Sequence, residues 1–513
     1  MNKITAQIRD LTERQLIALI SLGSILMTAW IMHIQQGWVT DDSILYFEVA
    51  RLFAAREWQQ GFALYGWPLY PALIALVHKL TGLTIQHSAQ LWNVIFFALT
   101  SYSFLTLIRL AGGHKQTIVW GGALLFSSPY IVGDVLPMLL RDEGFWAFFL
   151  ASLGFLLKFH RTAEFKWALY WQFCMIIAML FRIEALVFLL FTPLFMLLDS
   201  TFGWKERLLR YSKTQVLTLS AFISLILLVA FSRTLQPQDL GRIQEVITFL
   251  PRAYAQITQG LVHKSQLMGE QVLGKYLDDY GLLSILLTLT CITIIKIAGS
   301  AGLPALLSLA TPQKAKFYGL QNDARKLIFW VMAIGTVIAS VMILSTFILS
   351  SRYVIPLVFM LLVLAAFALF NMQNSVKGGK SRLHQSILAL ILLLVCINLI
   401  KNLLPPSEEH NYEQQAVTWL KKNSPPQASV FINNAKLRYY AGQAYTDRPD
   451  PWPWTLQAIE NNSIHEFDYL VLSLNGKNIE QQKYLSEVLT HHRLVNKFSR
   501  GPKKVVLIYA KKP

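Results

Sequence analysis

The chain carries little charge and little cysteine for its length. Asp, Glu, Lys and Arg make up only 15% of its 513 residues, whereas soluble domains carry about a quarter. Three cysteines are present, Cys174, Cys291 and Cys396, and all lie inside apolar runs. The sequence therefore predicts neither a disulfide framework nor a cysteine metal site. Because 54% of the residues are hydrophobic, this composition predicts a membrane protein with several spans.

Long apolar runs recur along the first four-fifths of the chain. The first, residues 15–34, is long enough to cross ~30 Å of hydrocarbon as a helix. The apolar core of a cleavable signal peptide would be shorter than this run, and a small-residue cleavage site would follow it. The residues from Met32 to Gln36 do not provide such a site. We therefore predict a polytopic α-helical protein with about eleven transmembrane helices. These are residues 15–34, 91–108, 117–133, 144–157, 168–181, 185–198, 216–231, 282–297, 327–349, 354–370 and 385–400.

Basic residues concentrate in alternate loops between these spans, for example Lys158, Arg161 and Lys166 in one loop and Lys205 and Arg207 in another. The positive-inside rule places such loops in the cytoplasm. This orientation puts the N-terminus inside and the C-terminal segment outside. It also accounts for the net charge of +17, so the lipid bilayer is the expected partner and nucleic acid is not.

The end of the chain differs in pattern from the rest. Residues 1–402 form the predicted transmembrane domain, and residues 403–513 form a predicted small α/β domain on the outer face. Strand-length apolar runs lie at 429–432, 469–472 and 505–508, with helical patterns at 412–422 and 479–489. A glycine-rich phosphate loop and metal-ligand spacing are both missing from this segment, so we expect no catalytic residue in it.

Two adjacent carboxylates, Asp41 and Asp42, stand where the first apolar run ends. They follow Thr40 and precede an amphipathic helical pattern that includes Ile44 and Phe47. One interpretation is structural, because Thr or Asp at this point caps a helix. The other is chemical: one carboxylate acts as a general base and the second orients it. A divalent cation bound by the pair is a third interpretation, and the spacing leaves all three open.

A short apolar run broken by two prolines follows, from Tyr65 to Val77. It is too short for a span. It predicts a second helix in the membrane interface, with Tyr65, Trp67 and Tyr70 at headgroup depth.

These features together resemble a known family. The acid pair beyond the first span, the aromatic amphipathic helix and the stretch from Pro68 to Ala75 resemble the GT-C membrane glycosyltransferases. Among them, the protein O-mannosyltransferases and the bacterial aminoarabinose lipid A transferases (glycosyltransferase family 39-like) are the most similar in arrangement. The pair is Asp-Asp here, where relatives often have Asp-Glu.

The resemblance implies a GT-C-like fold and a polyprenyl-phosphate-linked sugar as donor. It implies transfer with inversion to a lipid, glycan or protein acceptor, on the periplasmic face of a bacterial inner membrane. The catalytic base of the family corresponds to Asp41 or Asp42.

Several arginines are candidates to bind the donor phosphate. Arg352 and Tyr353 resemble the Arg-Tyr element of the family, although the pair could also be a membrane anchor. Arg141 and Arg182 lie in predicted outer loops, where arginine suits a phosphate close to the membrane. For Arg182, a salt bridge with Glu184 is the competing interpretation.

Four further residues are candidates for the acceptor side or a second wall of the site. Asp142 and Glu143 follow Arg141 in the second predicted outer loop, where an ion-pair cluster at the interface is the alternative. Tyr46 and Tyr70 come from the two amphipathic helices.

Three other functions compete with glycosyl transfer. A transporter or flippase would be expected to carry ionisable residues near mid-membrane, whereas here they cluster near the span ends. A polymerase or ligase of envelope glycans would not be expected to carry the acid pair or the C-terminal domain. A scaffold without catalytic activity is the third.

Overall fold

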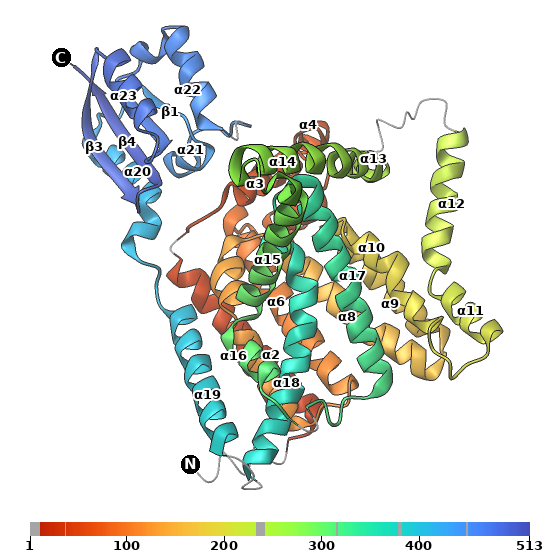
Figure 1. The fold of residues 1–513 in the computed structure, drawn as a ribbon. Coiled ribbons are helices and arrows are strands. Elements are labelled where there is room, and N and C mark those ends of the chain that lie inside the picture. The colour runs from red at the N-terminus through yellow and green to blue at the C-terminus, as the bar shows by residue number, and fades with distance from the viewer. Residues whose placement is uncertain are drawn as a thin grey trace.

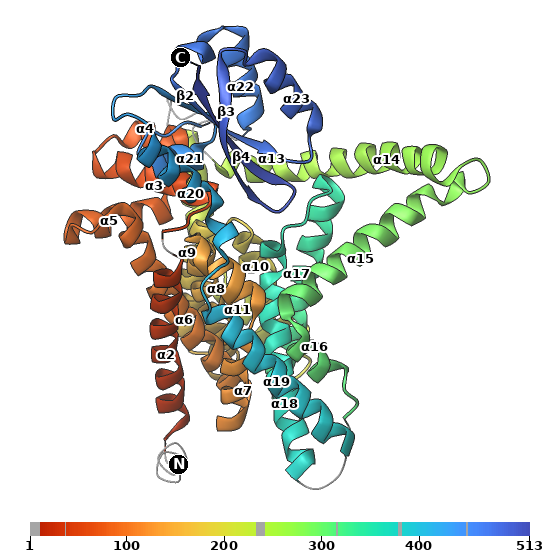
Figure 2. The same ribbon diagram turned by 90° about the vertical axis from the view of Figure 1, so that its left-hand side faces the viewer.

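The computed structural model describes residues 11–35, 37–231, 242–313, 316–377, 382–447 and 450–512. A large helical body carries a small domain at the end opposite the start of α2 (Glu13–Ile34) (Figures 1 and 2). The first part of the body consists of α2 (Glu13–Ile34), α3 (Asp41–Ala54), α4 (Trp58–Leu64), α5 (Leu69–Thr81), α6 (Ile85–Leu110), α7 (Lys115–Phe126), η1 (Pro129–Val135), η2 (Leu136–Met138), α8 (Asp142–Thr162), α9 (Phe165–Phe181), α10 (Ala185–Phe191), η3 (Thr192–Met196) and α11 (Trp204–Lys213). The second part consists of α12 (Val216–Phe231), α13 (Arg242–Ala255), η5 (Gln256–Gly260), α14 (Leu261–Leu267), η6 (Met268–Leu273), η7 (Asp278–Tyr280), α15 (Gly281–Ala301), α16 (Leu303–Ala310), α17 (Asn322–Thr346), η8 (Ser351–Val354), α18 (Ile355–Lys377) and α19 (Arg382–Leu403).

Each predicted span falls on helical structure, but the predicted number of spans is not confirmed. Among the described residues, six helical segments are long and apolar enough to cross a membrane: α2, α6, η7–α15, α17, η8–α18 and α19. A seventh results if α7 and η1–η2, which are bent by 42°, count as one span. The remaining predicted spans lie on short helices, such as α9 and α10, or on α8, which carries acids in its first turn and basic residues in its last.

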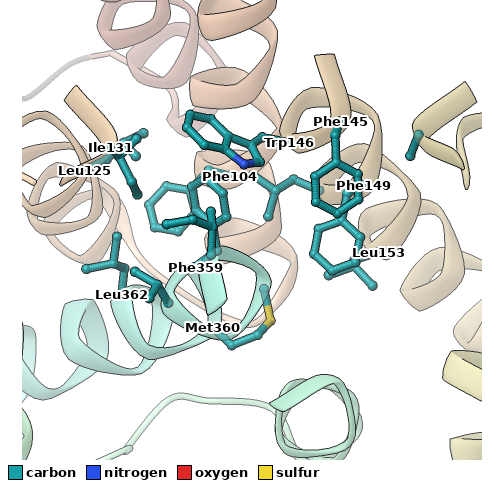
Figure 3. Close-up of a cluster of buried hydrophobic side chains, with 14 of the residues drawn as sticks. Phe104, Leu125, Ile131, Phe145, Trp146, Phe149, Leu153, Phe359, Met360 and Leu362 are labelled. Atoms are coloured by element: carbon teal, nitrogen blue, oxygen red, sulfur yellow. The ribbon is translucent and has the colours of Figure 1, made fainter. Parts of the chain in front are cut away.

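Aromatic packing joins α6, α8 and α18 at the centre of the body. Phe359 of α18 lies 5.8 Å from the Phe104 ring of α6 and 5.9 Å from the Trp146 ring of α8 (Figure 3). All three side chains are buried. Aromatic rings at such separations favour edge-to-face packing, which adds to the gain from their burial. This core joins α8, whose first turn carries Asp142 and Glu143, to α18, which follows Arg352 of η8 directly.

The interface aromatics pack inside the protein. Tyr65, Trp67 and Tyr70 expose only 8%, 8% and 1% of their surface. The ring of Tyr46 on α3 lies 5.4 Å from that of Tyr65 and 5.5 Å from that of Tyr70. These rings are therefore buried within the protein, and Tyr46 of α3 packs against Tyr65 and Tyr70. Their depth relative to the lipid headgroups stays a prediction.

The C-terminal domain is a four-stranded sheet with helices, as predicted. The strands are β1 (Val430–Ile432), β2 (Tyr469–Asn475), β3 (His492–Arg500) and β4 (Lys504–Lys511), and the helices are α20 (Tyr412–Asn423), α21 (Ala435–Ala441), α22 (Pro451–Glu460) and α23 (Ile479–Val488). The strand order is β1-β2-β4-β3, with β1 parallel to β2 and the other pairs antiparallel. The sequence did not predict β3, because this edge strand is mostly exposed and lacks an apolar run.

Candidate functional site

The acid pair lies in the first turn of α3, and Thr40 is its cap. Thr40 Oγ1 accepts a hydrogen bond from the Ser43 backbone N–H at 3.2 Å, and Ser43 Oγ accepts one from the Thr40 N–H at 3.2 Å. Ser43 Oγ also contacts the Met138 carbonyl oxygen at 2.5 Å, which ties the start of α3 to η2. The predicted cap is therefore present. Since a hydroxyl provides it, the carboxylates of Asp41 and Asp42 are available for other contacts.

Asp42 forms an ion pair with an arginine 310 residues further along the chain. The Nη1 atom of Arg352, on η8, lies 3.0 Å from Asp42 Oδ2 and 3.6 Å from Asp142 Oδ2. The Asp42 side chain is 49% exposed and that of Asp142 only 1%. Arg352 thus contacts both the solvent-exposed carboxylate of Asp42 and the buried carboxylate of Asp142.

Arg182 continues this chain of charges into the protein. Its Nη1 donates to Asp142 Oδ1, and its Nη2 lies 2.7 Å from Glu184 Oε1. Its guanidinium also lies over the Tyr353 ring, 5.1 Å from the ring centre. The predicted Arg182–Glu184 pair is therefore present. With both carboxylates engaged on a buried guanidinium, Arg182 holds the cluster together and has little capacity for a further anion.

The other predicted residues surround this cluster. Arg141 lies over the Tyr65 ring at 5.8 Å. Glu143 is fully buried, and within the described part of the chain neither of its carboxylate oxygens has a hydrogen-bond partner. Tyr46 and Tyr70 are buried and pack edge-to-face. Contact of these residues with an acceptor stays a prediction.

Asp41 faces a cavity of about 750 Å³ between the helical body and the C-terminal domain. Asp41 is partly exposed, but desolvation by the surrounding protein raises the pKa of its carboxyl above the ordinary value of 3.8, and the charges of Glu413 and Asp42 raise it further. The ammonium group of Lys436 opposes this shift. A carboxylate with a raised pKa accepts a proton more readily, as a general base requires.

The sequence did not predict that the C-terminal domain contributes to this site. Lys436 on α21 and Glu413 on α20 form an ion pair of 2.6 Å, and Lys436 lines the cavity that Asp41 faces. Neither residue belongs to a recognisable motif. The only sequence feature that could have indicated a contact with the helical body is the aromatic pair Tyr439-Tyr440. In the structure, Tyr440 Oη accepts a hydrogen bond from the Val39 N–H at 3.1 Å.

A metal at the acid pair finds no direct support in this geometry. Across the described ranges, no group of three or more His, Cys, Asp or Glu residues could hold a metal ion. The divalent cation at Asp41 and Asp42 stays a prediction.

Comparison with known proteins gives a match in fold. No protein-family model and no curated protein sequence matches the chain. Among solved structures, it is similar to ArnT from Cupriavidus metallidurans in the apo state. The TM-score is 0.50 at 12% identity, covering 96% of this chain and 97% of that one. The same protein bound to undecaprenyl phosphate matches with a TM-score of 0.42 at 14% identity, over the same shares of the two chains. The chain therefore has the fold of apo ArnT along nearly its whole length, which agrees with the GT-C-like fold that its acid pair and aromatic helices imply.

Proposed function

We propose that the protein is an inverting glycosyltransferase that moves a sugar from a polyprenyl-phosphate donor to an acceptor on the periplasmic face of a bacterial inner membrane. One observation carries the proposal. Asp42 and Arg352 meet at 3.0 Å, and the neighbouring Asp41 lines a large cavity. The first turn of α3 thus carries a candidate base next to an aspartate that contacts a candidate phosphate-binding cation, which supports the proposal.

In the proposed reaction, Asp41 is the base. The acceptor hydroxyl or amine gives its proton to Asp41 and attacks the anomeric carbon from the face opposite the phosphate. As the new bond forms, the bond between the anomeric carbon and the phosphate oxygen breaks, and its electron pair leaves with the phosphate. Protonation of the leaving group is unnecessary, because a phosphate leaves as an anion.

Arg352 is the proposed partner of the donor phosphate. It is 30% exposed, whereas the Arg182 side chain is 6% exposed and engaged with two carboxylates. A phosphate at Arg352 would compete with Asp42 for the same guanidinium. Asp42 and Asp142 hold this arginine in place before the donor binds.

The test is sugar transfer in membranes supplied with radiolabelled polyprenyl-phosphate sugars. We expect Asp41→Asn to lose transfer by ~10²-fold or more, because the amide accepts no proton. Glu48→Gln is a matched control, since Glu48 lies two turns further along α3 and pairs with the exposed Arg51. A wild-type rate in Asp41→Asn would show that Asp41 is not the base, and wild-type rates in both Asp41→Asn and Asp42→Asn would show that the acid pair is not the site. Absence of transfer by the wild type from every donor would reject the function itself.

A further inference from the structure

The cavity that Asp41 lines is enclosed by both parts of the chain. One wall comes from the helical body, including Asp134 of η1 and Lys401 near the end of α19. The opposite wall comes from the C-terminal domain, including Lys436, Arg500 and Lys504. Its volume of about 750 Å³ lies within the range of about 300–1,000 Å³ usual for ligand sites.

Positive charge dominates this lining. Four cations, Lys401, Lys436, Arg500 and Lys504, face two acids, Asp41 and Asp134. Lys436 is already paired with Glu413. Among the carboxylates whose side chains the structure describes, none lies within 4.0 Å of the charged groups of the other three cations.

Two of these cations stand directly opposite each other. In the antiparallel register of β3 and β4, Arg500 pairs with Lys504. The two residues close the β3–β4 hairpin, in which β3 runs toward the helical body and β4 runs back from it (Figure 1). Like charges at directly opposed strand positions are destabilising. An anion bound between them would relieve this repulsion.

The pKa of the histidine beside the cavity is lowered in part by the same positive charges. His410 also lines the cavity, and burial together with the charges of Arg500, Lys436 and Lys504 lowers its pKa to about 4. At neutral pH its ring is therefore uncharged. The ring lies 4.7 Å from that of Trp38, on the body side of the cavity.

Specific contacts hold the two walls together. In addition to the Tyr440–Val39 hydrogen bond, Tyr439 Oη donates to Gln86 Oε1 of α6 at 3.0 Å. The Lys436 ammonium lies over the Trp38 ring at 4.9 Å. The basic residues of the C-terminal domain are thus positioned relative to Asp41.

We propose that the C-terminal domain completes the acceptor site, and that Arg500, Lys504 and Lys401 bind an anionic, phosphate-bearing group of the acceptor. Binding there would bring the nucleophile of the acceptor to Asp41 in the same cavity. The identification of the ligand as the acceptor rests on the proposed function. The proposed binding of an anion rests only on the excess of cations that line the cavity and on the pairing of Arg500 with Lys504 across β3 and β4.

The test measures binding of two probes to the purified full-length chain in zwitterionic detergent by titration calorimetry. The probes are inorganic phosphate and dihexanoyl phosphatidic acid, with dihexanoyl phosphatidylcholine as a neutral reference. We compare the wild type with the double variant Arg500→Gln/Lys504→Gln. Lys503→Gln is the matched control, because Lys503 lies in the exposed turn between Arg500 and Lys504 but does not line the cavity. A melting curve of each variant verifies that it is folded.

We expect the wild type and Lys503→Gln to bind with the same Kd, and the double variant to bind at least about tenfold more weakly, since charge-assisted hydrogen bonds are lost. Binding of both probes would show that the phosphate group suffices, and binding of phosphatidic acid alone would show that a lipid headgroup is needed. Equal binding by the double variant and the control, or no binding of either probe by the wild type, would overturn the proposal. Anion binding without any sugar transfer by the wild type would reject the proposed function and leave this site standing.

Discussion

At the scale of single residues, Asp41 and Asp42 are neighbours with different surroundings. Asp42 forms an ion pair with Arg352, whereas Asp41 faces the cavity and lies among charges of both signs. The guanidinium of Arg352 therefore occupies the Asp42 carboxylate, whereas the Asp41 carboxylate faces the space that a substrate could enter. This contrast is why we assign the base to Asp41.

The pH dependence of sugar transfer should report the pKa of Asp41. A base acts only when deprotonated, so transfer should fall as the pH decreases through its raised pKa, and this acid limb should lie above pH 3.8. Lys436→Gln removes a charge that lowers this pKa, so it should move the acid limb to higher pH. Single-turnover rates across a pH series would measure the limb, with Lys503→Gln as control. An unchanged or lower limb in Lys436→Gln would contradict the assignment.

Arg182 should matter more for stability than an exposed arginine does. Arg182→Met leaves Asp142 and Glu184 without their guanidinium, and loss of one partner from a buried pair costs about 3–5 kcal/mol. Arg51→Met removes only the exposed pair with Glu48, which should cost about 0–1 kcal/mol.

Unfolding of both arginine variants in detergent, against the wild type, would measure these free energies. Similar losses in the two variants would show that the buried cluster does not stabilise the fold.

At the scale of the elements, α8 packs between α6 and α9 and carries Asp142 and Glu143 at its outward end. Close packing at that end depends on glycine. A Cβ atom added at Gly144 would lie 2.5 Å from the ring of Phe181, which is itself buried. The start of α8, and with it the acid cluster, therefore lies tightly against α9.

Two glycines of α8 provide a matched comparison. Gly144→Ala should destabilise the protein by about 1–3 kcal/mol, because the buried Phe181 ring has no room to move. Gly154→Ala places its Cβ at an ordinary 3.4 Å from Leu110, so it should stabilise α8 by about 0.5–1 kcal/mol through helix propensity. Thermal unfolding of the two variants would measure both changes in stability. A stabilising effect of Gly144→Ala would contradict the close packing of Gly144 against Phe181.

At the scale of the whole molecule, the candidate site lies where the C-terminal domain meets the body, at the end opposite the start of α2 (Figure 2). Basic residues of the loops used for the orientation are engaged within the body: the Arg161 side chain pairs with Asp323 at 2.6 Å, and Arg210 Nη1 donates to the His160 carbonyl oxygen at 2.7 Å. The side of the membrane on which these loops lie stays a prediction.

Membrane topology can be measured with single cysteines in a background that lacks the three native ones. Asn461→Cys in the C-terminal domain should react with a membrane-impermeant maleimide on intact spheroplasts. Ser212→Cys at the end of α11 should react only after lysis, because the positive-inside rule places that loop in the cytoplasm. Both positions are exposed. The reverse labelling pattern would place the C-terminal domain in the cytoplasm and reject the periplasmic site.

The sequence by itself determined the class of the molecule and most of its elements. Apolar runs predicted where helices form in the body, and three strand-length runs predicted β1, β2 and β4. These features are local, since hydrophobic periodicity and capping depend on residues within a few positions of one another. The exposed edge strand β3 has no such pattern and was not predicted.

Only the tertiary structure decided which charges meet. It paired Asp42 with Arg352 across 310 residues, and it brought Lys436 and Lys504 to the cavity that Asp41 faces. Ion pairs act over a few ångströms, and local sequence patterns do not determine which distant residues come that close. The packing of α3 against α5, α6 and α21 of the C-terminal domain does, and it gives two adjacent aspartates their different surroundings.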